Sequence, residues 1–552
     1  MSTGTAPAEA APPGRGRGLT RLGSGLRARL TLGRIILAAV LIGAVFAGVA
    51  LWKGEGGGAP PDRAARLVPA NAVLYLHVTI DRDSNQWKNA GALFPKSPLL
   101  LRLRDRLLRQ LAPGGKGLNF DRDVFPWLGK EASIALLPSG KRTARSLILL
   151  QVADRELAQS FLSRAKGQVH TSEYRGVTIH TYGKLSTAFM GDFLAVGRPE
   201  NVYRSIDAHW GLSPSLTTVS SFRLARRNLP ERQRLLYAYA SQEGVRGILR
   251  HRPGLLGWLA ALTDDPRLGG AVLGVTARQD GIHLDFASAL NGPAGRSAPR
   301  GLEGSFRPAL PGMVPAGAVA YLDMRGADRL LGKVTSLAGG TAVRLPAGLD
   351  ALRADFEGAG GAPIRRELRP LLTKEAALFA TPGALSPVLT MLVNDVHPKE
   401  ADELLTRLQP LLSRVLEQPA AGQVPFFRPQ RIGGVDAATL RISPVLQLTY
   451  SIFGGRLAVS TDPGGIRQIR ASREKITRNP LFAPEIQRAF SRVTALLFLD
   501  LDQLFALGEK AGLESSTGYR RLKSALTGMR ALSAVTSSSP TSNKAAIFIE
   551  VQ

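Results

Sequence analysis

The chain has 552 residues, 44% of them hydrophobic, a length that corresponds to about two to four domains with substantial cores. It contains no cysteine, which excludes disulfides, thiolate metal sites and cysteine nucleophiles. Its formal net charge of +28 should attract anionic polymers, unless it reflects only the compositional bias of a GC-rich genome. Because the basic residues do not alternate with aromatic residues in a stripe, we expect no specific nucleic-acid binding.

The N-terminal region divides into a basic tail and an apolar stretch. Residues 1–34, rich in glycine, alanine, proline and arginine, predict a disordered cytoplasmic tail. Residues 35–52 carry no charge and would span about 27 Å as a helix, close to the hydrocarbon thickness of a bilayer. Because arginines precede this stretch, we predict an uncleaved signal-anchor, which places the chain at the cell membrane as a single-pass protein with its N-terminus in the cytoplasm. A cleaved signal peptide is the alternative, since residues 47–50 are small.

A glycine- and proline-rich linker, residues 53–66, leads to the first structured region, residues 67–290. Hydrophobic spacing predicts both strands and helices in this region. A proline-marked turn runs into a strand within 68–77, and the other predicted strands are 130–136, 146–152, 188–196 with a break at Gly191-Asp192, 235–239, 272–277 and 282–287. The predicted helices are an amphipathic one from Leu99 to Leu111, one from an N-cap at Asp154 to Lys166, and one that follows Pro199. Tight turns are expected at 174–176 and at Asp280-Gly281.

A second linker, residues 291–312, is rich in glycine and proline and precedes a second structured region, residues 313–552. The pattern of the first region restarts there. The matched segments are 314–323 with 68–77, 374–376 with 130–132, 389–396 with the strand that ends at Val152, 433–435 with 175–177, 455–459 with 192–196, and 496–499 with 235–238. Landmarks that recur in one order over so long a period predict an internal duplication and not a solenoid.

The predicted fold class is α+β. Each structured region has more predicted strands than helices, and short turns join several strand pairs, which favours an antiparallel sheet over a wound parallel one. We therefore expect an N-terminal transmembrane helix followed by two homologous domains, each a mainly antiparallel sheet with packed helices.

The repeated landmarks also carry a resemblance to a known family. The pattern V-P-A-x-A-V-x-Y-L occurs at 68–76 and 314–322, a Lys-Glu strand follows each copy, and strands end in L-A-V at 194–196 and 457–459. Together with the apolar stretch, these features resemble an uncharacterised family of bacterial single-pass membrane-anchored proteins, a domain of unknown function, here as two tandem repeats. The resemblance covers most of residues 67–552 and implies a bacterial envelope location. The family has no known activity, so the resemblance implies no functional residues.

Motifs that carry chemistry are missing from the sequence or weak. No phosphate-binding loop, H-E-x-x-H zinc helix, G-x-S-x-G elbow or calcium loop occurs. Ser472 and Lys475 fit the S-x-x-K pattern of serine acylases, but two fixed positions match by chance and no K-T-G motif accompanies them. Tyr75 and Tyr321, at equivalent positions of the two regions, are predicted core residues, with an apolar groove lining as the alternative.

The histidines give a similar result. His170 and His180 could lie on adjacent strands of one hairpin, but two imidazoles without a third ligand make a poor zinc site. His77 and Asp323 hold equivalent positions, and this exchange suggests a solvated polar face. We therefore predict no catalytic, cofactor-binding or metal-ligating residue, and no cofactor.

The predicted function follows from duplication without catalytic motifs. We expect a non-enzymatic envelope protein that binds through its outward-facing regions or acts as a scaffold. The candidate partners are the membrane through residues 35–52, an apolar or anionic envelope ligand such as a lipid or polyanion, or another protein. The alternative is an envelope hydrolase whose active site the sequence does not identify. A pocket with convergent polar groups in only one repeat would favour the enzyme, and similar apolar grooves in both would favour binding.

Overall fold

The computed structural model of the chain describes residues 62–81, 83–93, 120–140, 143–164, 168–230, 233–249, 267–291, 305–326, 361–383, 386–415, 426–443, 446–482, 490–510, 512–539 and 541–551. Below, the first half denotes described residues up to 291, and the second half denotes those from 305 onward. The predicted tail, the apolar stretch 35–52 and the helix from Leu99 to Leu111 lie outside the described residues. None of the described helices combines the length and the apolar character needed to cross a membrane.

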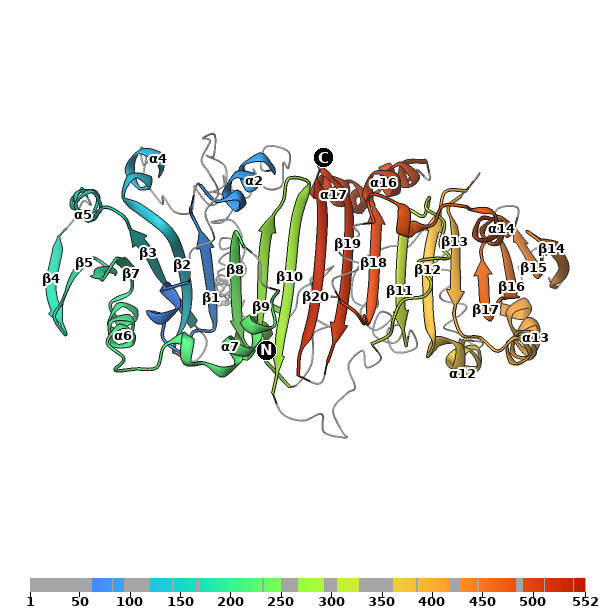
Figure 1. The fold of residues 1–552 in the computed structure, drawn as a ribbon, viewed down its shortest axis with the longest axis horizontal. Coiled ribbons are helices and arrows are strands. Elements are labelled where there is room, and N and C mark those ends of the chain that lie inside the picture. Colours follow the sequence, from blue (N-terminus) through green and yellow to red (C-terminus); the bar gives the residue numbers. More distant parts are fainter. Residues whose placement is uncertain are drawn as a thin grey trace, which may run out of the picture.

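Within the described residues, 20 antiparallel strands form one sheet that runs the length of the molecule (Figure 1). The strands of the first half are β1 (Leu74–Thr79), β2 (Leu128–Ser139), β3 (Thr143–Val152), β4 (Val169–Tyr174), β5 (Val177–Tyr182), β6 (Leu185–Met190), β7 (Phe193–Gly197), β8 (Leu236–Ser241), β9 (Leu268–Ala277) and β10 (Gly281–Leu290). Those of the second half are β11 (Ala320–Arg325), β12 (Glu375–Thr381), β13 (Val388–Val393), β14 (Arg428–Ile432), β15 (Val435–Ser443), β16 (Leu446–Phe453), β17 (Arg456–Ser460), β18 (Ala495–Asp500), β19 (Met529–Ser538) and β20 (Asn543–Val551).

Helices lie between the strands along the chain. The α-helices are α2 (Asn85–Leu93), α4 (Phe120–Asp123), α5 (Arg155–Ser163), α6 (Pro199–His209), α7 (Ser220–Arg227), α8 (Gln242–Leu249), α12 (Gly361–Leu372), α13 (Pro398–Val415), α14 (Pro463–Ala471), α16 (Leu501–Lys510) and α17 (Thr517–Leu526). The 3₁₀ helices are η1 (Ala64–Arg66), η3 (Phe125–Trp127), η4 (Leu216–Thr218), η5 (Ile476–Arg478) and η6 (Leu513–Ser515).

The strand pairing follows one linear order from edge to edge. The order is β4-β5-β6-β7-β3-β2-β1-β8-β9-β10-β20-β19-β18-β11-β12-β13-β17-β16-β15-β14. The second half therefore repeats the order of the first in reverse, so that β1 between β2 and β8 corresponds to β11 between β12 and β18. The halves meet where β10 pairs with β20, with Gly281 opposite Glu550 and Ala287 opposite Lys544.

The predicted fold class is wrong as a description of this architecture. We expected a transmembrane helix followed by two separate α+β domains, whereas the described residues form mostly one large antiparallel sheet without a membrane-spanning helix. The physical reason lies at the junction. A sheet that ended at β10 or β20 would leave a row of unpaired backbone groups at its edge, and pairing the two strands removes both edges.

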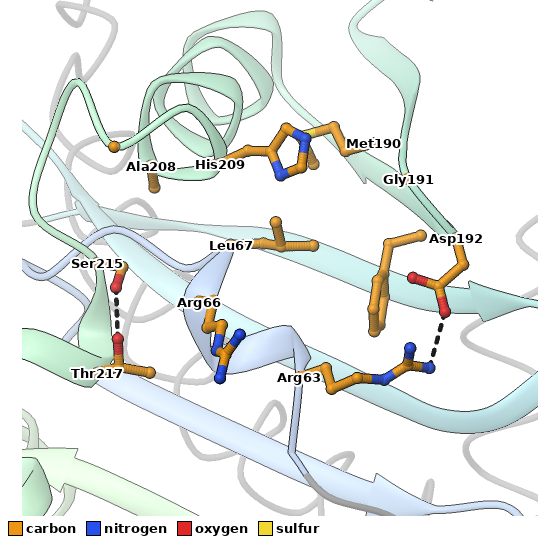
Figure 2. Close-up of a pocket in the computed structure, with 12 residues that line it drawn as sticks. Arg63, Arg66, Leu67, Met190, Gly191, Asp192, Ala208, His209, Ser215 and Thr217 are labelled. Atoms are coloured by element: carbon orange, nitrogen blue, oxygen red, sulfur yellow. Dashed lines mark hydrogen bonds and ion pairs between the residues drawn. The ribbon is translucent and has the colours of Figure 1, made fainter.

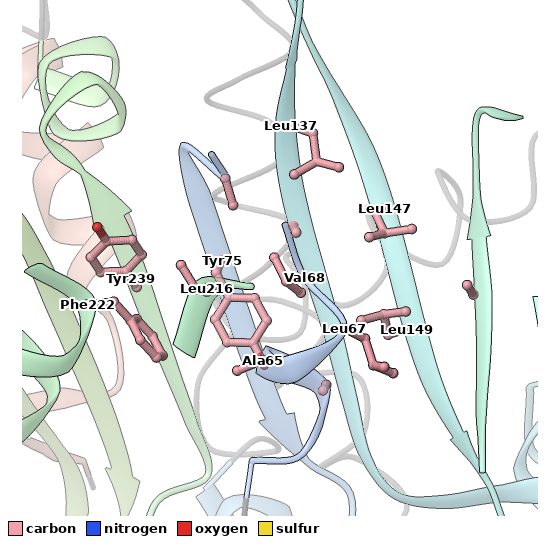
Figure 3. Close-up of a cluster of buried hydrophobic side chains, with 14 of the residues drawn as sticks. Ala65, Leu67, Val68, Tyr75, Leu137, Leu147, Leu149, Leu216, Phe222 and Tyr239 are labelled. Atoms are coloured by element: carbon pink, nitrogen blue, oxygen red, sulfur yellow. The ribbon is translucent and has the colours of Figure 1, made fainter. Parts of the chain in front are cut away.

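Side chains are buried on both faces of the sheet in the first half. All six residues of β1 are buried, and they alternate between two cores. On one face, Tyr75 packs edge-on against Phe222 of α7, which in turn packs against Tyr239 of β8, at ring-centroid distances of 6.2 and 5.1 Å (Figure 3). On the other face, Leu76 and Val78 belong to a core that includes Trp87 of α2.

The second half has a matching aromatic arrangement. Tyr321 of β11 packs edge-on against Phe482 at 6.0 Å, and Phe482 packs against Phe498 of β18 at 5.5 Å. Tyr75 and Tyr321 are 0% and 1% exposed, so the prediction that both are core residues is confirmed.

Several local predictions are confirmed. The Asp154 carboxylate accepts a hydrogen bond from the backbone N–H of Leu157 at 2.9 Å and so caps α5, although the helix ends at Ser163. The turn between β4 and β5 places Arg175 and Gly176 at positive φ, as the twist of a two-residue hairpin requires.

Two short segments, one before β1 and one before β11, lie mostly within the predicted linkers but are packed against the cores. We call residues 62–67 and 306–313 the lead segments. Ala64 and Ala65 are fully buried in the first, and Phe306 and Leu310 are buried in the second. The lead segments therefore belong to the cores.

Candidate functional site

A pocket of about 500 Å³ lies in the first half, between the lead segment, the β6–β7 turn and the end of α6 (Figure 2). It is lined by Arg63, Arg66, Leu67, Met190, Gly191, Asp192, Phe193, Ala208, His209, Gly211, Ser215 and Thr217. Its volume falls in the range of roughly 300–1,000 Å³ that is usual for small-molecule pockets. The pocket is therefore large enough for a small ligand.

Local backbone geometry shapes the pocket wall. Gly191, at φ +58°, forms the turn between β6 and β7, and Gly211, at φ +70°, follows α6. Both are conformations that side-chain-bearing residues rarely adopt. The sequence predicts the break at Gly191-Asp192 but not the pocket beside it.

The two arginines of the pocket differ in their electrostatic surroundings. The Arg63 guanidinium contacts the Glu131 carboxylate at 3.1 Å and the Asp192 carboxylate at 2.7 Å. Arg66 is exposed and makes no side-chain hydrogen bond or ion pair with any described residue. The charge of Arg63 is thus compensated by two carboxylates, whereas the charge of Arg66 is available to a ligand.

Beneath the pocket, Arg63 connects to a buried cluster of polar side chains. Glu131 is 0% exposed and accepts hydrogen bonds from the backbone N–H and Nε of Arg63, both at 3.1 Å. Nε2 of His77 lies 3.0 Å from Glu131 Oε2, so this nitrogen carries the proton that it donates to the carboxylate. Because Glu131 and His77 come from β2 and β1, the cluster ties the lead segment to two interior strands of the first half.

Asp62 completes this cluster from the lead segment. Its carboxylate accepts hydrogen bonds from the hydroxyls of Tyr75, at 2.6 Å, and Tyr237, and lies 3.9 Å from Nε2 of His77. Its side chain is 1% exposed, and the Arg226 guanidinium lies 3.9 Å away. Burial, together with the nearby Asp62 and Glu131 carboxylates, raises the pKa of the Tyr75 hydroxyl well above its usual value. Tyr75 therefore stays a hydrogen-bond donor.

Asp62, His77 and Glu131 have the residue types and spacing of a metal centre, with ligand atoms within 4.8 Å of one another. Their hydrogen bonding fits a different role. Both oxygens of each carboxylate already accept from the protein, and Arg63 supplies a positive charge to the cluster. A divalent cation would add charge to a site that Arg63 and Arg226 already balance. The arrangement is that of a satisfied hydrogen-bond network.

The equivalent cluster of the second half lacks both the imidazole and the arginine. Its residues are Tyr321, Asp323 and Glu375, and the Tyr321 hydroxyl donates to Asp323 at 2.7 Å. Burial, and then the charge of Glu375, raise the pKa of Asp323 well above its usual value. Glu375 instead accepts from the backbone N–H groups of Ala309 and Leu310, at 2.6 and 3.0 Å. It ties down its own lead segment as Glu131 does.

The region equivalent to the pocket also differs in the second half. Backbone bridges pair Pro69 with Ser215 and Pro315 with Lys475, so Lys475 takes the place of Ser215, which lines the pocket. The Lys475 ammonium donates to the carbonyls of Met313, at 3.5 Å, and Ile469, at 3.0 Å. Met313 in turn corresponds to the pocket residue Leu67 in sequence, so the lysine extends across the equivalent region.

The histidine pair considered from the sequence does not converge. His170 pairs with Thr181 and His180 pairs with Thr171 across the β4–β5 hairpin. Directly paired residues share a face of a sheet, so the two imidazoles point to opposite faces. His77 and Asp323 are 3% and 0% exposed, so the interpretation of a solvated face is wrong.

The S-x-x-K pair is likewise not arranged for catalysis. The Ser472 hydroxyl donates to the carbonyl of Glu474 at 2.6 Å, while the Lys475 ammonium is engaged by two other carbonyls. A general base must reach the hydroxyl that it activates. Neither residue contributes to the pocket of the first half.

The described residues form one extended antiparallel sheet with a small-molecule-sized pocket. The chain belongs to the family described as "Protein of unknown function (DUF3352)", whose model matches residues 34–551. The predicted resemblance to an uncharacterised family is thereby confirmed. The match does not bear on tandem repeats or membrane anchoring, which stay predictions.

Similarity to other proteins is limited. No curated protein matches the chain. Two solved structures that are similar to part of it are crystal forms III and I of TP0453, at 12% and 11% sequence identity. They cover 42% and 43% of this chain and 82% of their own chains, each with a TM-score of 0.26. Likeness at this level carries no argument about function.

Proposed function

We propose that the protein is a non-enzymatic binding module that holds a small ligand in the pocket of its first half. The pocket carries this proposal, because it combines a ligand-sized volume with buried apolar residues and an uncompensated arginine. Small-molecule sites are usually concave and mainly apolar, with a few polar groups that orient the ligand. The predicted location at the cell membrane stays a prediction, since residues 35–52 lie outside the described residues.

We also infer that the two halves arose by duplication and that only the first kept an open pocket. The matched strand order and the matched aromatic groups support this inference. Ser215 of the first half leaves space where Lys475 of the second half extends a long side chain. A pocket in only one half was expected to favour an enzyme. The difference in side-chain size between Ser215 and Lys475 explains it without catalysis.

The hydrolase alternative has less support among the described residues. Ser133 of β2 occupies the position paired with His77 of β1, and both accompany the carboxylates of the buried cluster. However, Ser133 is 1% exposed, His77 is 3% exposed, and neither lines the pocket. A nucleophile and its base must reach the substrate, and this pair lies inside the core.

The test is native mass spectrometry of the full chain, purified from the cells that produce it. The proposal expects a reproducible small-molecule mass on the wild-type protein and its loss in the variant Ser215→Met. This variant copies the length of Lys475 without its charge and so fills the pocket. Thr178→Met, on an exposed position of β5, is the matched control and should retain the mass. A bare wild-type chain, or a mass that survives Ser215→Met, contradicts the proposal.

A further inference from the structure

The floor and the rim of the pocket have different chemistry. Three buried apolar side chains form the floor, since Leu67, Met190 and Phe193 are 6%, 2% and 3% exposed. Arg66 and His209 also line the pocket and are exposed, so we take them as its rim (Figure 2). A ligand that fits this pocket places an apolar part inward and a polar part outward.

The sign of the polar part follows from the charges around the pocket. Its lining holds two arginines against one carboxylate, that of Asp192. Because Asp192 and Glu131 already neutralise Arg63, an incoming anion finds its partner in Arg66. Bonds between a guanidinium and a phosphate or carboxylate are stronger than neutral hydrogen bonds because they are charge-assisted. The net positive charge of the chain, +28, favours the approach of an anion.

Apolar surface continues beyond the pocket. Gly211 lines the pocket, and the residues on either side of it, Trp210 and Leu212, are 56% and 57% exposed. Exposed apolar side chains are ordinary when scattered, but these two adjoin a cavity with an apolar floor. They extend the apolar contact available to a ligand that is longer than the pocket.

We propose that the ligand is an amphiphile with one anionic head group, a phosphate or a carboxylate, bound by Arg66 at the rim. Its apolar part lies against Leu67, Met190 and Phe193. This inference rests on the proposed binding function and names the chemical class of its ligand. Arg63 is a positioning residue, since Glu131 and Asp192 hold its guanidinium along the pocket wall and leave the head group to Arg66.

The second half offers a contrast that supports this assignment. In sequence, Ala309 and Gly312 of its lead segment correspond to Arg63 and Arg66. No arginine is therefore available at those two positions, and Lys475 is engaged by backbone carbonyls. The proposed head-group site belongs to the first half alone.

The test is calorimetric titration of the full chain with octyl phosphate and with octanoate, each at concentrations where the probe is monomeric. Inorganic phosphate, octyl glucoside and octyltrimethylammonium are the comparison probes. We expect an eight-carbon anion to bind at least ten times more tightly than inorganic phosphate, since the latter lacks the apolar part. Whichever of octyl phosphate and octanoate binds more tightly identifies the head group as a phosphate or a carboxylate.

The variant Arg66→Gln removes the charge and should weaken binding of the octyl anion by about tenfold to a hundredfold, the loss expected for one charge-assisted bond. Arg473→Gln, at an exposed arginine of the second half, is the matched control and should leave binding unchanged. Circular dichroism establishes that both variants fold.

Two results separate this inference from the proposed function. If octyl glucoside binds as tightly as octyl phosphate, and Ser215→Met abolishes both, the pocket binds ligands but the anionic class is wrong. If Arg66→Gln binds the octyl anion as tightly as wild type, or if no octyl anion binds at all, the assignment to Arg66 is overturned.

Discussion

The two halves of the sheet bury equivalent clusters of polar side chains beside β1 and β11, but the residues in the clusters differ. In the first half, Arg63 compensates the Glu131 carboxylate, the Arg226 guanidinium lies near Asp62, and His77 and Tyr75 donate hydrogen bonds to these two carboxylates. The second half has no cation in the matching cluster, where burial and Glu375 instead raise the pKa of Asp323. In both halves, a glutamate near the start of β2 or β12 accepts hydrogen bonds from the lead segment. The two halves therefore hold the lead segment in the same way but neutralise the buried carboxylates differently.

The regions beside these clusters differ in the same way. The first half keeps a pocket beside Arg66, and the second extends Lys475 across the corresponding region. Substitutions at the paired positions can therefore test whether the halves differ in energetics as well as in shape.

The largest expected effect is at Glu131. Glu131→Ala leaves the backbone N–H and Nε of Arg63 and the imidazole of His77 without their acceptor, so we expect a loss of about 3–5 kcal/mol in the free energy of unfolding. Denaturant unfolding measures it, with the exposed Glu173→Ala as a control. A loss below about 1 kcal/mol would mean that the ion pair does not hold the lead segment.

Asp323→Asn should stabilise the second half at neutral pH. With its pKa raised in the folded state, Asp323 keeps its proton there while the unfolded chain loses it above pH 3.8. The wild-type protein therefore loses stability as pH rises above 3.8, until the raised pKa is passed, and the neutral asparagine lacks this loss. Thermal unfolding at pH 4 and pH 8 measures the difference. Equal effects at both pH values would show that Asp323 does not titrate differently on folding.

Lys475→Ser, which copies the first half, should destabilise by about 1–2 kcal/mol because two carbonyls lose their donor. Burial, and then Arg470, lower the pKa of the Lys475 ammonium. The wild type therefore gains stability as pH rises from that lowered pKa toward 10.5, a gain that the variant lacks. Chemical unfolding between pH 7 and pH 10 tests both expectations. A more stable variant at pH 7 would contradict the role assigned to Lys475.

The smallest effect is expected from Tyr75→Phe, at about 1 kcal/mol. The Asp62 carboxylate loses one donor but keeps the Tyr237 hydroxyl and the backbone N–H of Ala65. Tyr321→Phe provides the comparison, because the Tyr321 hydroxyl donates to Asp323. Denaturant unfolding of both variants measures the loss in the free energy of unfolding. We expect a smaller loss for Tyr75→Phe, because Asp62 keeps other hydrogen-bond donors. The reverse ranking would indicate that the first cluster is the more fragile.

Local structure was largely predictable from the sequence, because strand alternation and turn chemistry act over short distances. Asp154 as an N-cap and the hairpin turn at Arg175-Gly176 are examples. The pairing of β10 with β20 was not predictable in this way, since Ser288 and Asn543, which hydrogen-bond across it, are 255 residues apart. No local pattern distinguishes an edge strand from one that a distant segment will complete.

The buried cluster was missed for two reasons. Asp62 stands in a glycine- and proline-rich stretch that indicates a flexible linker. The presence of His77 in one half and Asp323 at the equivalent position of the other indicates a solvent-exposed position. A usable signal was present in the apolar residues on both sides of His77, since Leu76 and Val78 belong to one core and Tyr75 to the other. A strand that is apolar at successive positions is buried on both faces, so a polar residue within it must find partners.

The central junction also bears on how the molecule reaches its native state. The pairing of β10 with β20 joins residues that are 255 positions apart in sequence, and such non-local pairing forms more slowly than hairpins such as β9–β10. Until β10 and β20 pair, each half has an unpaired edge strand, β10 in the first half and β20 in the second. The β20 of another copy matches the open β10 as well as its own does. The pairing that unites the halves therefore offers, at high concentration, a route to strand exchange between molecules.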